Sequence, residues 1–405
     1  MSAGLVSELL SESARNPQPG YFPSPTVPVR FQFEQGAPSP DAFPVEALNE
    51  ATLAAQRKYG PLLCGYSDGN RTDMKYGTLS LREAVAAWLE KREGRPFSTE
   101  QLMLTNGSAQ AISLAAKAFL DPGDGVVAEA LTFPFATDYF RADGAEIARA
   151  AMDEHGLLVS EVEARLDEFA ARGVKPKIIY TIPTFQVPTG RVLPLDRRKA
   201  LLELAAERGV LVIEDNCYYS LRYSGEPVPS LLSLDTHGIV LQSDSFSKVI
   251  APGLRMGWIT GSPPAIEALG AVRQDLGVSQ WNARVLEEFV SSGAFETHLE
   301  NVIAHNREKR DAASAALRRY CSQWLDFTDP EGGIFFWIRL ADNIDCDQLQ
   351  QNCLERGISV RPGEVFSSDP GAARYLRLGF LPPSSEDLEL GIKIFGQALE
   401  RSQTS

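Results

Sequence analysis

The chain has 405 residues, of which 39 are Lys or Arg and 53 are Asp or Glu, so its formal net charge is −14. This length exceeds what one compact core usually holds and indicates two domains. The negative charge argues against a surface that binds nucleic acid or anionic membranes.

Residues 1–30 are rich in Pro and Ser after a short apolar-periodic start, which predicts a helix or arm followed by extended chain. From about residue 60 to 285, apolar runs alternate with helical patterns such as Ser80 to Arg92 and Asp196 to Arg208. This alternation is typical of βαβ units with a mostly parallel sheet, and we expect an α/β fold.

Helical patterns near Glu287 to Arg319 lead to a smaller C-terminal part. There the runs from Pro330 to Leu340 and from Tyr375 to Phe380 read as strands, and Glu386 to Arg401 reads as a closing helix. We therefore predict an N-terminal arm and entrance segment at 1–59, a large domain at 60–285 and a small α+β domain at 286–405.

The first segment whose residues suggest a ligand site runs from Asn106 to Pro134. A short strand, Gln101 to Thr105, precedes Gly107-Ser108-Ala109, which opens an apolar helix. Free N–H groups at such a helix start form an anion site, although a glycine turn with an N-cap serine has the same pattern. A further strand at Gly125 to Ala128 precedes Phe133, whose ring suits stacking on a flat ligand or ordinary core packing.

Two more apolar runs end in polar or Pro-rich loops. Ile178 to Ile182 precedes Val187-Pro188-Thr189-Gly190, where an Xaa-Pro bond is a candidate for a cis peptide. Val210 to Ile213 ends in Glu214-Asp215, at the strand edge where α/β sheets bind ligands. Asp215 suits pairing with a protonated ring nitrogen, with Tyr218 three residues on, and the alternative is an Asp that caps the next element.

The run SDSFSKVIAPGLRMGW, Ser243 to Trp258, places Lys248 among hydroxyl groups and seven residues before Arg255. A lysine held in a pocket can form a Schiff base with an aldehyde. Pyridoxal phosphate is the common aldehyde cofactor, and its phosphate needs hydroxyl groups and an arginine, which Ser245, Ser247 and Arg255 supply. The alternative is a surface lysine in a Ser-rich loop.

Taken together, these motifs resemble the fold-type I pyridoxal phosphate (PLP) enzymes, specifically class I/II aminotransferases of the aminoadipate and valine-pyruvate-like branch. The resemblance covers about Phe31 to Leu399. It implies that Lys248 carries the cofactor, Asp215 holds its ring nitrogen, Tyr218 contacts its phenolic oxygen and Phe133 stacks on its ring. It further implies that the phosphate is held by Ser108, Ala109, Ser245 and Arg255, that Arg377 binds the substrate α-carboxylate, and that Gly36, in the entrance loop Phe33 to Pro44, lies near the substrate.

Two positions depart from that family pattern. The family usually has Asn-Pro-Thr-Gly, where Asn donates to the phenolic oxygen, but this chain has Val187, which cannot donate. Relatives also carry a tyrosine that reaches the partner subunit's phosphate, five residues before the glycine that corresponds to Gly77. That place is Thr72 here, and we favour Tyr66 over Tyr76 for the role.

The resemblance implies an aminotransferase that uses PLP, an amino-acid substrate and a 2-oxo acid, in a homodimer with shared sites. One alternative is a specialised PLP enzyme of a natural-product pathway that eliminates, replaces, oxidatively deaminates or decarboxylates. The other is a ligand sensor, as in transcription regulators with an aminotransferase-like domain. Those carry a DNA-binding domain ahead of that part, whereas about 30 residues here are too few for one.

The apolar runs, the N-terminal residues and the cysteines indicate the cellular compartment of the protein. No apolar run has membrane-spanning length, and the N-terminus lacks the basic start and apolar block of a signal peptide. The five cysteines are scattered without metal-ligand spacing, and Cys217 suits a buried structural thiol near the site. We therefore expect a cytoplasmic protein without a membrane, nucleic-acid or metal partner.

Overall fold

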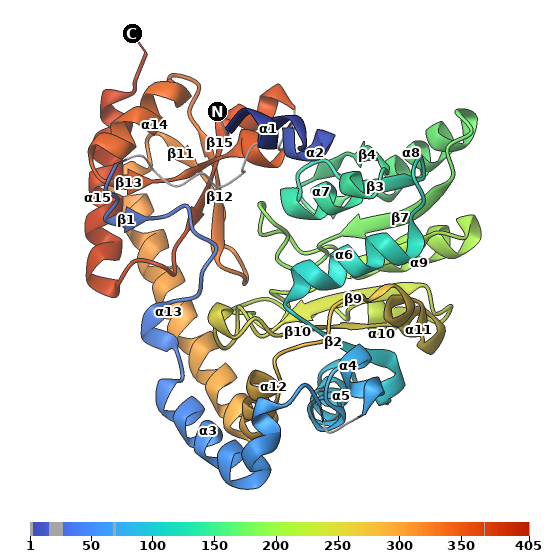
Figure 1. Cartoon of the computed structure of the whole chain (residues 1–405). Helices are drawn as coiled ribbons and strands as arrows, with labels where there is room; N and C mark the ends of the chain where they lie inside the picture. Colours follow the sequence, from blue (N-terminus) through green and yellow to red (C-terminus); the bar gives the residue numbers. More distant parts are fainter. Residues whose placement is uncertain (1–2, 16–26, 68–69, 368, 405) are drawn as a thin grey trace.

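A computed structural model describes residues 3–15, 27–67, 70–367 and 369–404. The two largest sheets of the described residues lie side by side (Figure 1). Short N-terminal helices α1 (Ala3–Glu8) and α2 (Glu12–Arg15) agree with the predicted helical start, while the extended chain predicted after them falls largely on residues 16–26, outside the described part. Within the described residues, no helix combines the length and apolarity needed to cross a membrane.

The larger sheet has seven strands, and all neighbouring pairs are parallel except those of β10, which runs antiparallel to both neighbours. The strands that carry Val, Ile and Leu runs are buried on both faces, as expected for a covered parallel sheet. In spatial order they are β2 (Leu102–Thr105), β10 (Gly257–Thr260), β9 (Val240–Ser245), β8 (Leu211–Asp215), β7 (Pro176–Thr181), β3 (Gly125–Glu129) and β4 (Glu146–Ala150).

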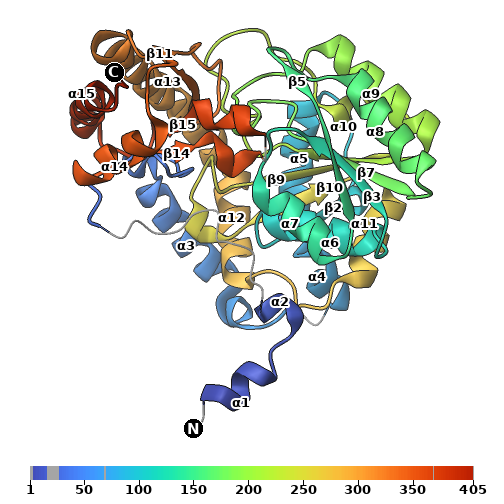
Figure 2. The same ribbon diagram turned by 90° about the horizontal axis from the view of Figure 1, so that it is seen from above.

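Helices cover both faces of this sheet (Figure 2). One side carries α6 (Ser108–Phe119), α7 (Pro134–Ala142) and α11 (Pro263–Val272), and the other carries α8 (Val159–Ala171) and α9 (Leu195–Arg208). Helix α9 ends where Gly209 takes a left-handed conformation (φ 63°), which glycine adopts without strain. The predicted mostly parallel α/β architecture is therefore confirmed.

The smaller sheet is antiparallel, in the order β11 (Leu325–Asp326), β12 (Phe335–Leu340), β15 (Tyr375–Gly379) and β14 (Arg361–Pro362). Helices α14 (Cys346–Glu355) and α15 (Ser385–Arg401) pack beside it. After α12 (Gln280–Ser291), the 28-residue helix α13 (Ala294–Cys321) leads from the larger part to the smaller. The strands and closing helix predicted for the C-terminal part are thus present, while the boundaries at 59/60 and 285/286 stay a prediction.

The N-terminal segment that contains Phe31 and Phe33 precedes the larger part in the sequence but packs first against the smaller part. Strand β1 (Phe31–Gln32) pairs in parallel with β13 (Ile358–Ser359). The rings of Phe31 and Phe33 fill the space left by Gly391 of α15, where a Cβ would lie 2.8 Å from each ring. The chain then passes through the loop after Phe33 to α3 (Val45–Tyr59), which packs on α12. This path brings the loop across the junction of the two parts.

Between α3 and β2 the chain forms three short elements and one long helix. They are η2 (Gly60–Cys64), α4 (Arg71–Tyr76), η3 (Thr99–Gln101) and α5 (Leu79–Glu93), which agrees with the helix predicted at 80–92. The buried guanidinium of Arg92 on α5 binds Asp244 Oδ2 at 2.5 Å, and Asp244 Oδ1 accepts from the Ser245 backbone N–H at 2.7 Å. Helix α5 thereby fixes the end of β9.

An aromatic cluster anchors the loop that follows β9. The ring of Phe246 lies 4.8 Å from that of Trp258 and 5.6 Å from that of Phe295, centroid to centroid, with edge-on geometry in both pairs. Phe246 is fully buried, as are its two partners. The loop therefore leaves the sheet with its first residue, Phe246, fixed in the core, two residues before Lys248.

Candidate active site

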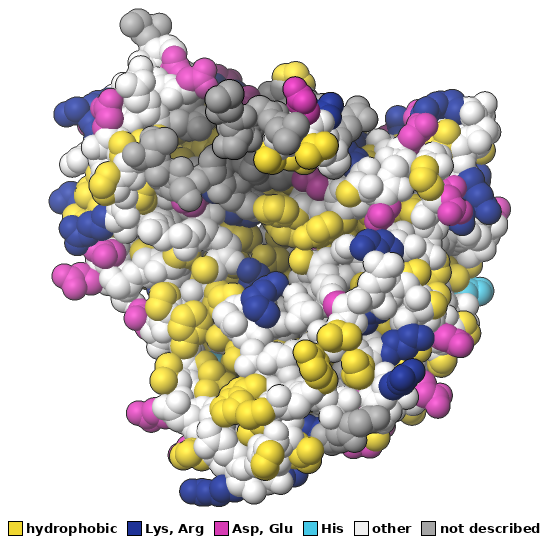
Figure 3. Space-filling model, in the orientation of Figure 1, with side chains coloured by type: hydrophobic (Ala, Val, Ile, Leu, Met, Phe, Trp, Pro, Cys, Tyr) yellow, Lys and Arg dark blue, Asp and Glu magenta, His cyan; other side chains and the backbone are white. Residues whose placement is uncertain are grey.

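A cavity of about 530 Å³ opens at the carboxyl ends of β8 and β9, between the larger sheet and the smaller one. Figure 3 shows apolar side chains lining a recess in the middle of this face. Ligands of open α/β sheets bind at such strand ends. Residues of the entrance loop, the start of α6 and the small sheet complete the wall.

One end of the cavity is built as an anion cradle. Helix α6 begins at Ser108, and the N-cap place is taken by Gly107 (φ 83°) rather than by a serine, as the N-cap alternative would require. A Cβ on Gly107 would lie 2.8 Å from Nη2 of Arg255, so glycine permits the guanidinium to approach the helix start. The free N–H groups of the first turn and this cation together favour an anion.

Hydroxyl groups complete that cradle. Ser245 Oγ lies 2.8 Å from Ser247 Oγ and accepts from the Ser247 backbone N–H at 3.0 Å. Both serines line the cavity, as do Ser108 and Ala109. Hydroxyl groups, backbone amides and an arginine are the set that phosphate binding requires.

Lys248 lies inside the cavity, and its Nζ donates to the backbone oxygen of Gly36 at 2.5 Å. Burial lowers the pKa of Lys248, and the charges of Arg377 and Arg255 lower it further. A lower pKa raises the fraction of neutral amine, which is the nucleophilic form. The surface-lysine alternative for this position is therefore wrong.

Asp215 is held by a partner that the sequence did not point to. Tyr180 on β7 is fully buried, and its hydroxyl donates to Asp215 Oδ2 at 2.8 Å. Tyr180 pairs with Ile213 across β7 and β8, so its side chain shares a face with Asp215, two residues further on. Burial raises the pKa of Asp215, while the bond from Tyr180 counteracts this. The other oxygen, Oδ1, is buried without a hydrogen-bond partner of standard geometry among the described residues.

A second buried carboxylate fixes the loop that carries Val187. Glu129 accepts hydrogen bonds from Thr181 Oγ1 (2.6 Å), from the Ile182 backbone N–H (3.1 Å) and from Gln186 Nε2 (2.8 Å). Burial raises the pKa of Glu129 to about 7. Gln186 in turn accepts from Thr189 Oγ1 at 2.6 Å. The loop is thus tied to β3 on one side of Val187, and the Val187–Pro188 peptide is cis, as the Pro-rich sequence suggested.

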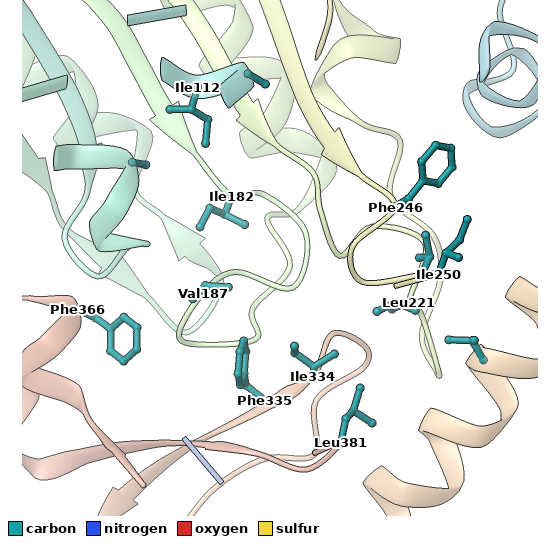
Figure 4. Close-up of a cluster of buried hydrophobic side chains, with 14 of the residues drawn as sticks. Ile112, Ile182, Val187, Leu221, Phe246, Ile250, Ile334, Phe335, Phe366 and Leu381 are labelled. Carbon is teal, nitrogen blue, oxygen red and sulfur yellow. The ribbon is translucent and has the colours of Figure 1, made fainter. Parts of the chain in front are cut away.

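Val187 itself lies in an apolar environment. Figure 4 shows it on the loop from the larger part, with Ile182 on one side and Phe335 of the smaller part on the other. Its side chain is buried and lines the cavity.

The small sheet contributes two arginines. Arg377 on β15 is buried, its Nη2 donates to the backbone oxygen of Glu34 at 2.7 Å, and its guanidinium lies 4.0 Å from the centroid of the Phe335 ring. Burial lowers the pKa of Arg377 to about 9. Arg361 on β14 lies beside it, with Nη2 3.5 Å from Glu34 Oε2. A surface role for Arg377 is therefore wrong.

The cavity gathers all the predicted site residues except one. Its wall contains Gly36, Ser108, Ala109, Phe133, Val187, Asp215, Tyr218, Ser245, Lys248, Arg255 and Arg377. Tyr66 does not line it and is 73% exposed. Tyr76, the alternative to Tyr66, packs its hydroxyl against Gly270 of α11, where a Cβ would lie 2.8 Å away.

Sequence reasoning missed several wall residues. Phe135, Phe335, Glu34 and Arg361 line the cavity but were not assigned from the sequence, whereas Cys217, which also lines it, was expected as a buried thiol near the site. A tyrosine in a buried strand needs a partner for its hydroxyl, and that signal would have pointed to Tyr180. Arg361 directly follows the apolar-rich run Ile358 to Val360, and an arginine at such a place was the corresponding signal for Arg361.

Comparisons with known proteins agree with this geometry. Residues 44–391 match the family model described as aminotransferase class I and II. The chain is 35% identical to aromatic-amino-acid aminotransferase 1 of Thermococcus litoralis, covering 90% of this chain and 87% of that protein. It is 33% identical to 2-aminoadipate transaminase of Thermus thermophilus, covering 92% and 91%.

Among solved structures, kynurenine aminotransferase of Pyrococcus horikoshii superimposes with a TM-score of 0.90 at 31% identity, covering 100% of both chains. That structure was determined with the pyridoxamine form of the cofactor and with kynurenine. The fold, the cavity and these matches lead to one conclusion: the chain belongs to the class I and II aminotransferases, which are PLP-dependent enzymes.

Proposed function

We propose that this aminotransferase attaches its cofactor to Lys248 and transfers the amino group of an α-amino acid to a 2-oxo acid at the cavity between the two sheets. One observation carries the assignment: the residues predicted from separate motifs, Tyr66 apart, line a single cavity. Four motifs between Gly107 and Arg255, together with Arg377 of a fifth segment, converge there.

The residues present fit PLP group by group. The cradle at Gly107 and Arg255 suits the phosphate. Oδ1 of Asp215 suits a protonated ring nitrogen, because a buried carboxylate oxygen without a hydrogen-bond partner of standard geometry among the described residues is costly. Tyr218 suits the phenolic oxygen, and Phe133 suits the ring face. When bound, PLP supplies an aldehyde for the amino group and a ring that accepts the negative charge left at the α-carbon.

The chain's own residues then hold and move protons. Lys248 has a lowered pKa, and with the cofactor in place its Nζ would be suited to take the α-proton of the substrate and to deliver it to the carbon that carried the aldehyde. Asp215 keeps the opposite end of the ring protonated, which matters most when negative charge spreads into the ring. Arg377 orients the substrate through its carboxylate, which a guanidinium binds with two parallel hydrogen bonds.

Attachment to Lys248 can be tested directly. Borohydride treatment of the holoenzyme, followed by peptide mass mapping, should find the reduced cofactor on the peptide that contains Lys248 and should abolish the visible absorption band. Lys309 is the matched control, because it is also buried but donates to Ser39 Oγ and to the backbone oxygen of Leu381, outside the cavity wall. A label on Lys309, or none on Lys248, contradicts the proposal.

We further propose a homodimer with shared sites. The surface around η2, α5 and α12 exposes large apolar side chains, Leu62, Tyr66, Leu79, Leu276 and Trp281, and Figure 3 shows apolar groups gathered over this lower part of the molecule. Burying such groups against a second copy is favourable. Tyr66 does not line the cavity of its own chain, which suits a role at the partner's phosphate.

Two measurements test the dimer. Light scattering should give twice the chain mass, and a monomer that turns over substrate contradicts the proposal. Mixing Lys248→Ala chains with Tyr66→Phe chains should then restore activity lost by both, because one site of each mixed dimer keeps Lys248 from one chain and Tyr66 from the other. If mixing restores nothing although mixed dimers form, Tyr66 does not serve the partner's site.

We also propose a cytoplasmic location. The five cysteines are all unpaired, and three of them, Cys217, Cys321 and Cys353, are buried as thiols, which is typical of a reducing compartment. Fractionation of the native source with an antibody against the chain tests this.

One observation favours a second candidate reaction. Val187 stands where the family usually has an asparagine that contacts the cofactor's phenolic oxygen, and its side chain is buried at the cavity wall. The cofactor's electronics therefore differ from those of the usual aminotransferase site. The alternative is a specialised reaction such as elimination, replacement, oxidative deamination or decarboxylation. Mass spectrometry of the products from each amino acid that bleaches the visible band separates the two reactions.

A further inference from the structure

The wall of the cavity contains a second arginine beside the one assigned to the substrate carboxylate. Arg361 on β14 pairs with Arg377 on β15 across the antiparallel ladder. Residues directly opposite in such a pair project to the same face of the sheet with Cβ atoms about 5 Å apart. Arg361 is 7% exposed and Arg377 is 3% exposed, and both line the cavity. Two buried like charges therefore face one site.

Glu34 of the entrance loop contacts both guanidinium groups in different ways. Its backbone oxygen accepts from Arg377 Nη2 at 2.7 Å, and its carboxylate Oε2 lies 3.5 Å from Arg361 Nη2. The side chains of Glu34 and Arg361 are both largely buried. The main chain of Glu34 thus positions Arg377, while its side chain neutralises Arg361.

The charges of the wall can be matched one by one. Its cations are Lys248, Arg255, Arg361 and Arg377, and its acidic side chains are Glu34 and Asp215. Under the proposed function, Arg255 meets the phosphate, Lys248 bonds the cofactor, Asp215 meets the ring nitrogen and Arg377 meets the α-carboxylate. Arg361 and Glu34 remain, and they neutralise each other.

The cavity wall also contains apolar side chains beside polar ones such as Gln35. Phe135, Ile182, Val187 and Phe335 line the cavity, and Figure 4 shows Phe335 and Val187 lying close together at the junction of the two parts. An uncharged side chain removes this surface from water at a gain of about 25 cal/mol per Å². A second carboxylate on the substrate would instead meet Glu34 in a poorly solvated place, where like charges repel strongly.

We infer that Glu34 is the specificity-determining residue of this site: it neutralises Arg361, so the pocket accepts amino acids and 2-oxo acids with one carboxylate and an apolar or aromatic side chain, and discriminates against dicarboxylic ones. The inference rests on the proposed role of Arg377. It places the selection in the charge of one side chain, because the backbone contact of Glu34 with Arg377 does not depend on that charge. Glu34→Gln therefore removes the neutralising carboxylate and keeps the α-carboxylate site.

Two carboxylic acids that carry no amino group test this without turnover. The dissociation constants of 3-phenylpropanoate and glutarate for the holoenzyme are measured by isothermal titration calorimetry at fixed ionic strength. We expect the wild-type protein to bind 3-phenylpropanoate at least about tenfold more tightly than glutarate. In Glu34→Gln the ratio should move toward glutarate by about tenfold or more, because Arg361 becomes available to the second carboxylate. Adding Arg361→Met to Glu34→Gln should cancel that change.

The matched control is Glu331→Gln, which makes the same chemical change in an Arg–Glu pair with Arg222 outside the cavity wall. It should leave the ratio as in the wild type. An unchanged ratio in Glu34→Gln, or tight glutarate binding by the wild type, overturns the inference. Equal loss of both acids in Arg361→Met also overturns it, since Arg361 would then serve the α-carboxylate.

The failure of the proposed function looks different. If the purified protein shows no visible band that borohydride abolishes, then the assignment of the cavity itself fails. If the band is present but neither acid binds any variant, then Arg377 does not hold a carboxylate and the inference fails, while the attachment of the cofactor in this cavity stands.

Discussion

The two sides of the cavity differ in how they are built. The side formed by the larger sheet places Asp215 and Lys248 at or just after the ends of adjacent parallel strands, β8 and β9, with backbones fixed by the ladder and by Phe246 in the core. The side formed by the smaller sheet places Arg361 and Arg377 on an antiparallel pair and completes it with the entrance loop at Glu34. We assign the chemistry to the first side and the choice of substrate to the second.

This division of roles between the two sides of the cavity can be tested by substitutions on each side. Changes on the side of the larger sheet should affect every substrate alike and alter the cofactor's spectrum. Changes on the side of the smaller sheet should affect binding and discrimination, with the cofactor retained.

Lys248→Ala should lower turnover by at least about a thousandfold for all substrates, because the amine provides both the attachment and the proton transfer. The phosphate cradle at Gly107 and Arg255 remains, so weak cofactor binding should persist without a covalent link. Steady-state rates and absorbance before and after borohydride check this. Near-normal turnover in the variant would remove Lys248 from the chemistry.

Asp215→Asn should lower turnover by about a hundredfold or more while cofactor occupancy falls much less, since the carboxylate acts on charge that develops in the ring. Glu214→Gln is the matched comparison on the same strand. Glu214 accepts from the backbone N–H groups of Leu231 and Leu232 at 2.9 and 3.0 Å, so its amide should lower the free energy of unfolding by about 1–3 kcal/mol. Rates and thermal melts of both variants decide: a loss of fold in Asp215→Asn that matches its loss of activity would make Asp215 structural.

Arg377→Met should weaken binding of 3-phenylpropanoate and raise KM by about a hundredfold, with a smaller effect on the visible band. Arg339→Met, on the small sheet but outside the cavity wall, is the control and should leave both unchanged. If Arg377→Met instead removes the cofactor while KM holds, then the small sheet does not select the substrate and the division of roles is wrong.

The sequence predicted the side of the larger sheet better than the other, and the reason is physical. A buried parallel strand is a continuous apolar run, so the polar residue at its end, such as Asp215, can be recognised from the sequence. The small sheet has short strands, and β14 spans only Arg361–Pro362, too short for any periodicity. Arg377 was found by resemblance, whereas the contact of Glu34 with both arginines joins residues more than 300 positions apart and has no local signal.

The Tyr180–Asp215 bond was missed for a similar reason. Tyr180 lies inside an apolar run, where it reads as core, and only the register of β7 against β8 brings it to Asp215. The fold class and most of the cavity wall could therefore be predicted. The contacts that tune each group required the structure.

Tyr180→Phe should move the acid limit of activity to higher pH. Burial raises the pKa of Asp215, and the hydrogen bond from Tyr180 favours its ionised form, so removing that bond raises the pKa further. Activity needs the ionised carboxylate of Asp215 and is lost as the pH falls through its pKa. This loss should therefore begin at higher pH in the variant. Rates near neutral pH should change by less than about tenfold. Profiles of kcat/KM against pH check this, and coincident acid limbs would show that Tyr180 only packs.

Val187→Asn should give the smallest effect, and it bears on the reaction rather than on the substrate. Asparagine would donate a hydrogen bond to the cofactor's phenolic oxygen, whereas valine leaves that oxygen to Tyr218 and to the proton at the nitrogen of Lys248. With one donor fewer, the oxygen holds that proton more strongly, so the wild-type protein should keep its yellow form to higher pH than Val187→Asn, by about one unit. Val187→Ala, which also lacks a donor, is the control and should titrate with the wild type.

If Val187 tunes the reaction, the asparagine variant should also shift its products toward plain transamination. Spectral titration of the three proteins, with their products identified by mass spectrometry, decides: coincident curves and one product mixture would mean that Val187 only fills the apolar space between Ile182 and Phe335.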